Sequence, residues 1–186
     1  TNKNYELRTI SFDNANQTWK SQQSMSFKSD TIAVYGVGLI GGSIALAAKQ
    51  RGLTKRVIGI GRSAEKLAEA QRAGIIDSWV HRLEDAAETV DFVVVCSPVQ
   101  TIADSICNCA SACQPGTLIT DAGSVKEVIC EEVSGRLDDD VAFIGSHPIA
   151  GSHLRGFQNA SGDLFVDRVC VVTPTEPAEA KSEPMS

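Results

Sequence analysis

Short apolar runs alternate with longer segments of helical character from residue 31 onward. The apolar runs are rich in β-branched residues, and buried parallel strands have this composition because helices cover both faces of their sheet. Glycines or a Pro-Gly pair end most of the helical segments. We predict strands at 31–35, 56–60, 91–96, 117–120, 142–145 and 168–173, a weaker strand near 79–80, and helices at 39–51, 64–73, 99–113 and 125–137.

The alternation of strands and helices predicts an α/β fold. Right-handed crossovers then arrange a mostly parallel sheet with helices on both faces, the doubly wound, Rossmann-type layout. In such sheets ligands bind beyond the carboxyl ends of the strands. The polar motifs that follow the predicted strands are therefore the candidates for a functional site.

A glycine-rich loop follows the first predicted strand and opens the first predicted helix. Gly36, Gly38 and Gly41 fit the G-x-G-x-x-G pattern of dinucleotide-binding folds, with Leu39 and Ile40 between them. The three glycines allow a tight turn, close approach of the backbone to a pyrophosphate, and close packing of helix on strand. The helix amino end offers free N–H donors to the phosphates. The loop predicts an NAD(P) site; its alternative is a glycine-rich turn without a ligand.

The end of the second predicted strand indicates which dinucleotide is preferred. NAD-specific folds place Asp or Glu there to bind the ribose 2′-hydroxyl. This chain has Gly61, followed by Arg62 and Ser63. Because a guanidinium favours a 2′-phosphate that a carboxylate would repel, we predict a preference for NADP, with NAD possible. The alternative is that Ser63 caps the following helix and Arg62 is solvated.

The strongest predicted strand ends at Ser97-Pro98. Serine as N-cap with proline at the first helical position is ordinary chemistry for the start of a helix. Because the pair also follows a strand, we predict that Ser97 and Pro98 line the cofactor.

The chain divides into three parts by composition. Residues 1–29 are rich in Ser, Gln and Asn without a sustained period, which predicts a disordered polar leader. Residues 30–173 form the predicted NAD(P)-binding Rossmann domain. Residues 174–186 are a polar run without apolar periodicity, predicted to be a linker or a truncated helix start.

Charge and cysteine usage exclude several classes of partner. The net charge of −6 argues against nucleic acid and anionic membranes. An unbroken apolar run such as Phe92–Cys96 is far too short to cross a membrane. The six cysteines lack the paired spacing of a zinc site, so we expect no metal, inert thiols in a reducing compartment, and a cytoplasmic location.

Two further motifs follow predicted strands: DAGSVK at 121–126 and GSHPIAGS at 145–152. Together with GVGLIGGS at 36–43, in this order and spacing, they resemble the amino-terminal domain of the prephenate/arogenate dehydrogenases of tyrosine biosynthesis. The resemblance covers roughly residues 31–175. Related hydroxy-acid dehydrogenases share only the first glycine motif convincingly, so the resemblance is specific.

The resemblance implies oxidative decarboxylation of a cyclohexadienol: prephenate to 4-hydroxyphenylpyruvate, or arogenate to tyrosine, with hydride passing to the nicotinamide. The family's catalytic histidine falls on His147, and its hydroxyl-binding serine falls on Ser124. An imidazole, with a pKa near neutrality, suits removal of the hydroxyl proton. Pro148 favours extended backbone at His147. Lys126 belongs to the same motif and could attract the anionic substrate.

Each of these residues also has a structural alternative. Ser124 with Glu127 fits a capping box, His147 fits a structural residue in a polar loop, and Lys126 fits a solvated helix charge. His81 is predicted to be a surface residue. Ser152 and His153 are hypotheses for the substrate lining. Many relatives carry an acidic residue where this chain has His153, which leaves the choice between prephenate and arogenate open.

Family members continue into a helical domain that forms a homodimer and supplies basic residues to the substrate site. That domain is expected to be absent from this chain, so dimerisation is expected for the full-length parent, and the chain alone is expected to have low activity. Two alternatives remain. One is a non-catalytic NADP-binding fragment. The other is another dehydrogenase of the same architecture, such as a β-hydroxyacid dehydrogenase or a pyrroline carboxylate reductase.

Overall fold

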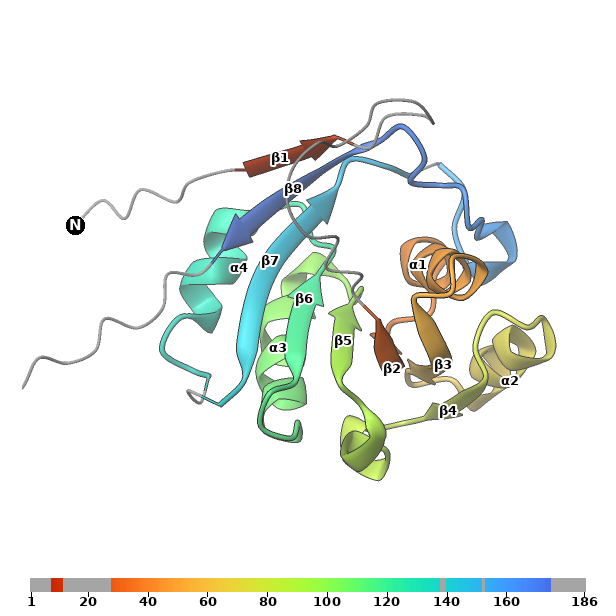
Figure 1. Ribbon diagram of the computed structural model, residues 1–186, viewed down its shortest axis with the longest axis horizontal. Helices are drawn as coiled ribbons and strands as arrows, with labels where there is room; N and C mark the ends of the chain where they lie inside the picture. The colour runs from red at the N-terminus through yellow and green to blue at the C-terminus, as the bar shows by residue number, and fades with distance from the viewer. Residues whose placement is uncertain (1–7, 12–27, 138–139, 152, 175–186) are drawn as a thin grey trace, which may run out of the picture.

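In the part of the chain that the computed structural model describes, residues 8–11, 28–137, 140–151 and 153–174, eight strands form one sheet with helices on both faces (Figure 1). The strands are β1 (Arg8–Ser11), β2 (Ser29–Tyr35), β3 (Thr54–Ile60), β4 (Ser78–Val80), β5 (Phe92–Val95), β6 (Leu118–Asp121), β7 (Ala142–Pro148) and β8 (Val169–Pro174). The α-helices are α1 (Leu39–Gln50), α2 (Ala64–Arg72), α3 (Ile102–Ala110) and α4 (Lys126–Val133), with 3₁₀ turns η1 (Leu83–Asp85), η2 (Ala87–Thr89), η3 (Val99–Thr101) and η4 (Phe157–Asn159).

The strand order places a topological switch point at β2. The order is β1-β8-β7-β6-β5-β2-β3-β4, and the strands from β7 to β4 are all parallel. The chain leaves β2 toward β3 on one side and later returns to β5 on the other. Because this reversal opens a crevice at the carboxyl ends, β2 is where a dinucleotide is expected. The doubly wound, mostly parallel fold predicted from the sequence is confirmed.

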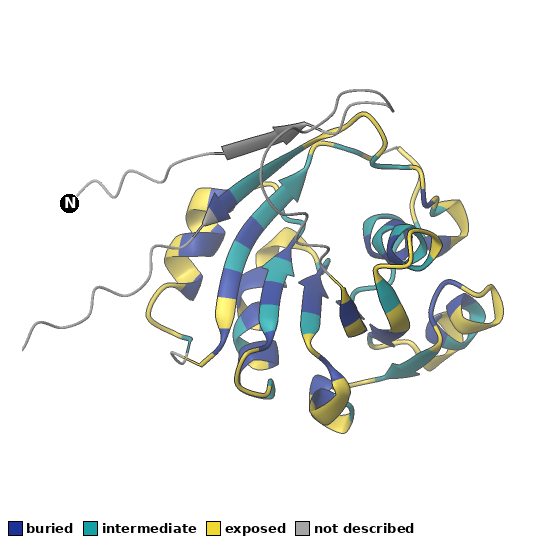
Figure 2. Cartoon of the chain, viewed as in Figure 1, coloured by how far each residue is buried: buried dark blue, intermediate teal, exposed yellow. Residues whose placement is uncertain are grey.

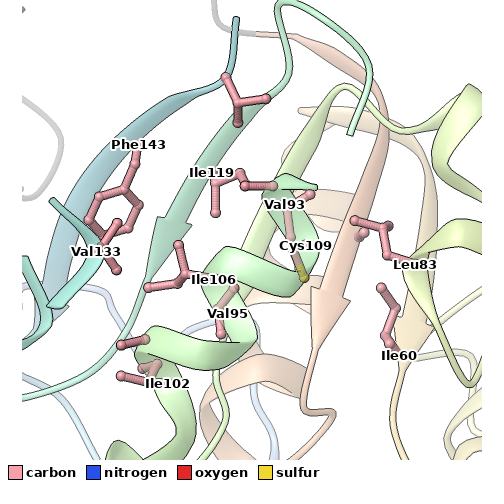
Figure 3. Close-up of a cluster of buried hydrophobic side chains, with 14 of the residues drawn as sticks. Ile60, Leu83, Val93, Val95, Ile102, Ile106, Cys109, Ile119, Val133 and Phe143 are labelled. Carbon is pink, nitrogen blue, oxygen red and sulfur yellow. The ribbon is translucent and has the colours of Figure 1, made fainter. Parts of the chain in front are cut away.

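Two hydrophobic clusters lie on opposite faces of the sheet and hold the layers together. Val93 and Val95 of β5 belong to the cluster that packs against α3 and α4, which Figure 3 shows in close-up. Val94 points the other way, into the cluster under α1 and α2. Because alternate residues of a strand face opposite sides, the unbroken apolar run predicts this double burial. Figure 2 shows the buried central strands between the partly exposed helices.

The sheet continues beyond β7 with two antiparallel strands. β8 pairs with β7, with His147 opposite Val171, and β1 pairs with β8. Residues 8–11 therefore form a strand within the segment predicted to be a disordered leader. Residues 1–7, 12–27 and 175–186, which hold most of the rest of that leader and nearly all of the predicted linker, lie outside the described residues.

Two predicted helices are shorter than the sequence indicates. The helix expected over 125–137 is α4, which ends at Val133 because Ser134 is extended (ψ 125°) and Gly135 has a left-handed φ of 77°. The helix expected over 99–113 divides into η3 and α3. None of the helices in the described ranges is long and apolar enough to span a membrane.

All six cysteines are free thiols. Burial raises the pKa of Cys96 and of Cys109 to about 12, and that of Cys113 to about 11. Thiols with such pKa values stay protonated near neutral pH, and a protonated thiol is a poor nucleophile and a poor metal ligand. These cysteines act as small apolar side chains in the core.

Candidate active site

The glycine loop is packed so tightly that two of its glycines are required by the fold itself. Gly36 has a φ of +95°, and a Cβ there would lie 2.8 Å from the carbonyl oxygen of Cys96. A Cβ on Gly41 would lie 2.3 Å from the carbonyl oxygen of Gly36. Any side chain at either position would push α1 away from β2 or distort the turn between them.

Gly38 is different, because a Cβ there would meet no atom of the described chain within 4 Å. It is the N-cap of α1, so the helix begins without a side-chain cap and without an acidic residue in its first turn. The first N–H groups of a helix have no intrahelical partner and carry the positive end of its dipole. The loop therefore offers an open anion site, and its residues fit the pyrophosphate of a dinucleotide.

A groove of about 380 Å³ lies over this loop. Its lining combines the glycine loop, Cys96 and, from the segment that follows β7, Ala150, Gly151, Leu154, Arg155 and Gly156. Leu39 and Ile40 are part of the lining, as the sequence predicts. Arg155 is the charged residue among those that line it, and the sequence does not single it out. Arg155 reaches the groove because the chain folds back after β7, and no local sequence pattern predicts this course of the chain.

The end of β3 carries the three residues that predict cofactor preference. Arg62 and Ser63 are exposed, and Ser63 Oγ accepts a hydrogen bond from the Lys66 N–H (3.3 Å), so Ser63 is the N-cap of α2. His81 is exposed, as predicted, and its Nδ1 lies 2.9 Å from the carbonyl oxygen of Gly61. A Cβ on Gly61 would make ordinary contacts with the Leu67 side chain, at 3.6 Å. The position therefore has room for a side chain.

Ser97 is not the helix cap that the sequence predicts. The N-cap of η3 is Pro98, one residue later than expected. Ser97 Oγ instead donates to Ser105 Oγ (3.1 Å), which in turn donates to the carbonyl oxygen of Thr101 (2.7 Å). The serine therefore fixes the loop after β5 onto α3 through side chains rather than by capping.

The end of β6 carries a buried ion pair that the sequence does not predict. Asp121 is fully buried, and its Oδ2 is bonded to Lys126 Nζ and accepts from the Gly123 N–H (2.8 Å). Its Oδ1 accepts from the N–H of Ser146 on β7 (3.1 Å). The Lys126 side chain is 9% exposed, so it is not the solvated helix charge proposed as its alternative role.

Ser124 is exposed, between Asp121 and α4. The N-cap of α4 is Val125, which has no hydroxyl, so the capping box suggested by the sequence is not formed. The Ser124 hydroxyl is thus not committed to the start of the helix.

His147 lies inside β7 rather than in the polar loop that the sequence predicts, because β8 pairs with this stretch and extends the strand. The side chain is half-buried. Burial lowers the pKa of its imidazole below 6.5; the charge of Lys126 lowers this pKa further, and that of Asp121 raises it. The imidazole is therefore neutral at physiological pH, the form that accepts a proton.

His147 lies outside the lining of the groove, which the chain enters three residues later, at Ala150. Of the two residues predicted to line the substrate, His153 is exposed and Ser152 lies outside the described residues.

Comparison with known proteins identifies the family. The family described as prephenate dehydrogenase, nucleotide-binding domain, matches residues 44–182. The chain belongs to the prephenate dehydrogenase family. The match begins within α1, so it does not include the glycine loop itself.

Relatives of this prephenate dehydrogenase domain are longer proteins. The chain is 34% identical over 159 residues to the prephenate dehydrogenase of Bacillus subtilis (strain 168), covering 85% of this chain and 43% of that protein. The structure of Synechocystis arogenate dehydrogenase has a TM-score of 0.71 and 32% identity, covering 81% of this chain and 52% of that one. Prephenate dehydrogenase from A. aeolicus, in complex with hydroxyphenyl propionate and NAD⁺, has a TM-score of 0.73 and 28% identity over 84% of this chain and 54% of that one. The chain thus spans about half the length of these relatives.

Proposed function

We propose that this chain is the cofactor-binding half of an NADP-preferring dehydrogenase that oxidatively decarboxylates prephenate or arogenate, with His147 as the base. The observation that supports this most directly is that the glycine loop after β2 and His147 near the end of β7 lie at the same, carboxyl, edge of one parallel sheet. Ligands of doubly wound sheets bind along this edge. A cofactor and an imidazole placed there suit hydride transfer coupled to proton transfer.

The reaction needs one proton acceptor at the substrate hydroxyl. His147 takes the hydroxyl proton as a hydride leaves the same ring carbon, and the new C=O bond forms. Loss of CO₂ from the ring then makes the ring aromatic, and the electrons from the broken C–C bond end on that oxygen, which takes the proton back from His147. The nicotinamide, when bound, supplies the hydride acceptor. The neutral imidazole indicated by the lowered pKa of His147 is the form required at the start.

Ser124 is proposed to hold the substrate hydroxyl. It follows β6, the strand beside β7, and its hydroxyl is not used to cap α4. A serine hydroxyl can accept a hydrogen bond from the substrate O–H or donate one to the imidazole, so it can align the two groups.

The phosphates are proposed to lie on the amino end of α1, with Arg155 across the groove as their counter-charge. The backbone N–H groups supply direction, whereas the guanidinium supplies a full positive charge. Arg155 is the cationic lining residue of that groove, which makes it the natural partner of a dianionic pyrophosphate.

The preference for NADP is proposed from Gly61 and Arg62. It is tested with Gly61→Asp, because the site has room for the side chain and the variant should fold. The aspartate is expected to weaken NADPH binding relative to NADH by about 10–100-fold through repulsion of the 2′-phosphate. Affinities from cofactor fluorescence decide the point. Gln114→Glu, which adds the same charge at an exposed residue before β6, at the opposite edge of the sheet, is the matched control. An unchanged preference in Gly61→Asp would refute the electrostatic explanation.

The reaction itself is tested on the protein translated from the complete reading frame. We expect formation of NADPH with prephenate or with arogenate, matched by release of CO₂. Binding of NADPH without turnover of either substrate would instead support a non-catalytic binding module. Turnover of a β-hydroxyacid that survives His147→Asn would support another dehydrogenase of the same architecture.

A further inference from the structure

We propose that the buried Asp121–Lys126 pair is a positioning pair that holds the strand of His147 against the loop of Ser124 and sets the charge beside the imidazole. The catalytic consequence depends on the function proposed above for His147. The structural coupling does not, and it can be measured on the 186-residue chain itself.

The bonds of one carboxylate join the two segments. Backbone pairing of β6 with β7 runs from Leu118 opposite Ala142 to Thr120 opposite Ile144. Past that register, Asp121 accepts from the Ser146 N–H (3.1 Å) and from the Gly123 N–H (2.8 Å). These two donors immediately precede His147 and Ser124 in the chain. Beside His147 and Ser124, the Asp121 carboxylate therefore takes the place of the backbone hydrogen bonds between β6 and β7.

Ser146 strengthens the same connection through its hydroxyl. Its Oγ donates to the carbonyl oxygen of Asp121, and it accepts from Thr120 Oγ1 (3.1 Å), which also contacts the carbonyl oxygen of Ile144 (2.6 Å). Side-chain and backbone bonds thus alternate along the last residues of the two strands. Such a network fixes a spacing more rigidly than a single hydrogen bond.

The lysine is placed where stability alone does not favour it. Lys126 is the first residue of α4, where a positive charge opposes the helix dipole, and its side chain is almost fully buried. A buried ion pair is often no more stabilising than two apolar residues of similar volume, because both charges lose their hydration. The presence of a lysine at this unfavourable position is therefore better explained by the effect of its positive charge on a neighbouring group.

The neighbour is His147, on the same face of β7 as the lysine stem. A Cβ on Gly145 would lie 3.5 Å from Lys126 Cδ, so Gly145 faces the lysine. Residues two apart in a strand share a face, which places His147 on that side as well. The charged groups that act on the imidazole are Lys126 and Asp121, from α4 and β6. From β8, Cys170 contacts the His147 backbone, and burial raises the pKa of its thiol, so it is neutral.

Removing the two charges one at a time is expected to move the His147 pKa in opposite directions. Lys126→Met leaves the Asp121 carboxylate and should raise the pKa of His147 by about 0.5–1 pH unit. Asp121→Asn leaves the Lys126 ammonium and should lower the pKa of His147 by a similar amount. The double variant should return toward the original value. A pair that only stabilises the fold would not produce opposite shifts.

The measurement is an NMR titration of the three histidines of the chain, with the His147 resonance assigned from its loss in His147→Asn. Arg136→Gln, which removes an exposed ion pair with Asp104 just after α4, is the control and should leave the His147 pKa unchanged. Lys126→Arg keeps the charge and should keep the pKa close to its original value. Shifts of the same sign in the two single variants, or no shift in variants that still bind NADPH, would overturn the proposal.

A measurement without any substitution covers the case in which the variants do not fold. In the unmodified chain, the ¹³C resonance of the Asp121 carboxyl should move at the midpoint of the His147 titration, because the two groups sense each other's charge. A carboxyl resonance that does not change through this midpoint would overturn the proposal.

In the active protein, the acidic limb of the pH profile of kcat/KM should shift in the variants by the same amount as the His147 pKa measured by NMR. If NMR shows the coupling and no turnover is found, the function fails but the coupling stands.

Discussion

The two ends of the candidate site are built in different ways. The glycine loop after β2 uses backbone: Gly36 and Gly41 allow close packing, and Gly38 leaves open space beside the uncapped start of α1. The ends of β6 and β7 use side chains, with Asp121 bonded to Lys126, to Gly123 and to Ser146. A binding loop formed by backbone depends on a few residues that are neighbours in sequence, whereas a network of side chains depends on contacts between residues far apart in sequence.

This difference predicts how each end responds to substitution. At the backbone end, a single methyl group can block the ligand or disrupt the fold, depending on which glycine carries it. At the side-chain end, a substitution can remove chemistry while the cofactor site remains intact. The variants below separate the two ends, from the largest expected effect to the smallest.

His147→Asn separates chemistry from binding most strongly. In the protein from the complete reading frame, we expect kcat to fall by about 10²–10⁴-fold, because the proton acceptor is lost. NADPH affinity should stay within about twofold, since His147 lies outside the lining of the groove. Steady-state rates and cofactor fluorescence measure the two quantities. His81→Asn, at the exposed histidine near Gly61, is the matched control and should retain turnover.

Gly38→Ala and Gly41→Ala test the backbone end with the same methyl group. Gly38→Ala should leave stability unchanged, because its Cβ meets open space, yet weaken NADPH binding by about tenfold or more by occupying the approach of the pyrophosphate. Gly41→Ala should lower the free energy of unfolding by about 1–3 kcal/mol, since its Cβ would lie 2.3 Å from the Gly36 carbonyl oxygen. Thermal unfolding and cofactor titration distinguish the two. If both variants changed stability and NADPH binding to the same extent, the proposal that Gly38 lies against the pyrophosphate would be refuted.

The same contrast explains what the sequence could predict. The glycine loop is a local pattern, and neighbouring residues predict it. The cap formed by Ser63 is also local, but from the sequence it is only the alternative to a role for Ser63 in cofactor binding. The strand containing His147 was predicted to end at 145, because Ser146, His147 and Pro148 lack an apolar pattern; pairing with β8 extends it. Neither the bond from Ser146 to Asp121 nor the approach of Arg155 to the groove could be predicted, because each depends on segments brought together by the completed sheet.

Arg155→Gln tests the counter-charge across the groove. We expect NADPH binding to weaken by about 3–10-fold at low salt, because one charge-assisted hydrogen bond to the phosphates is lost. The difference from the unmodified chain should shrink at high salt, where exposed charges are screened. Arg72→Gln, at an exposed arginine at the end of α2, is the matched control. If Arg155→Gln lowered turnover but left NADPH binding unchanged, Arg155 would instead be assigned to binding the substrate.

The smallest expected effect is the dependence of folding stability on the protonation of His147. Burial lowers the pKa of the imidazole in the folded chain below the value of about 6.5 that it has when unfolded. Between these two pKa values the unfolded chain binds more protons, so stability should be full above pH 6.5 and decline as the pH falls below it, levelling off below the folded pKa. The free energy of unfolding from urea titrations at several pH values, minus that of His147→Asn, isolates this contribution. A difference that grows as the pH falls would mean that the folded chain favours the charged imidazole, and that the side-chain end is built to hold a cation rather than a base.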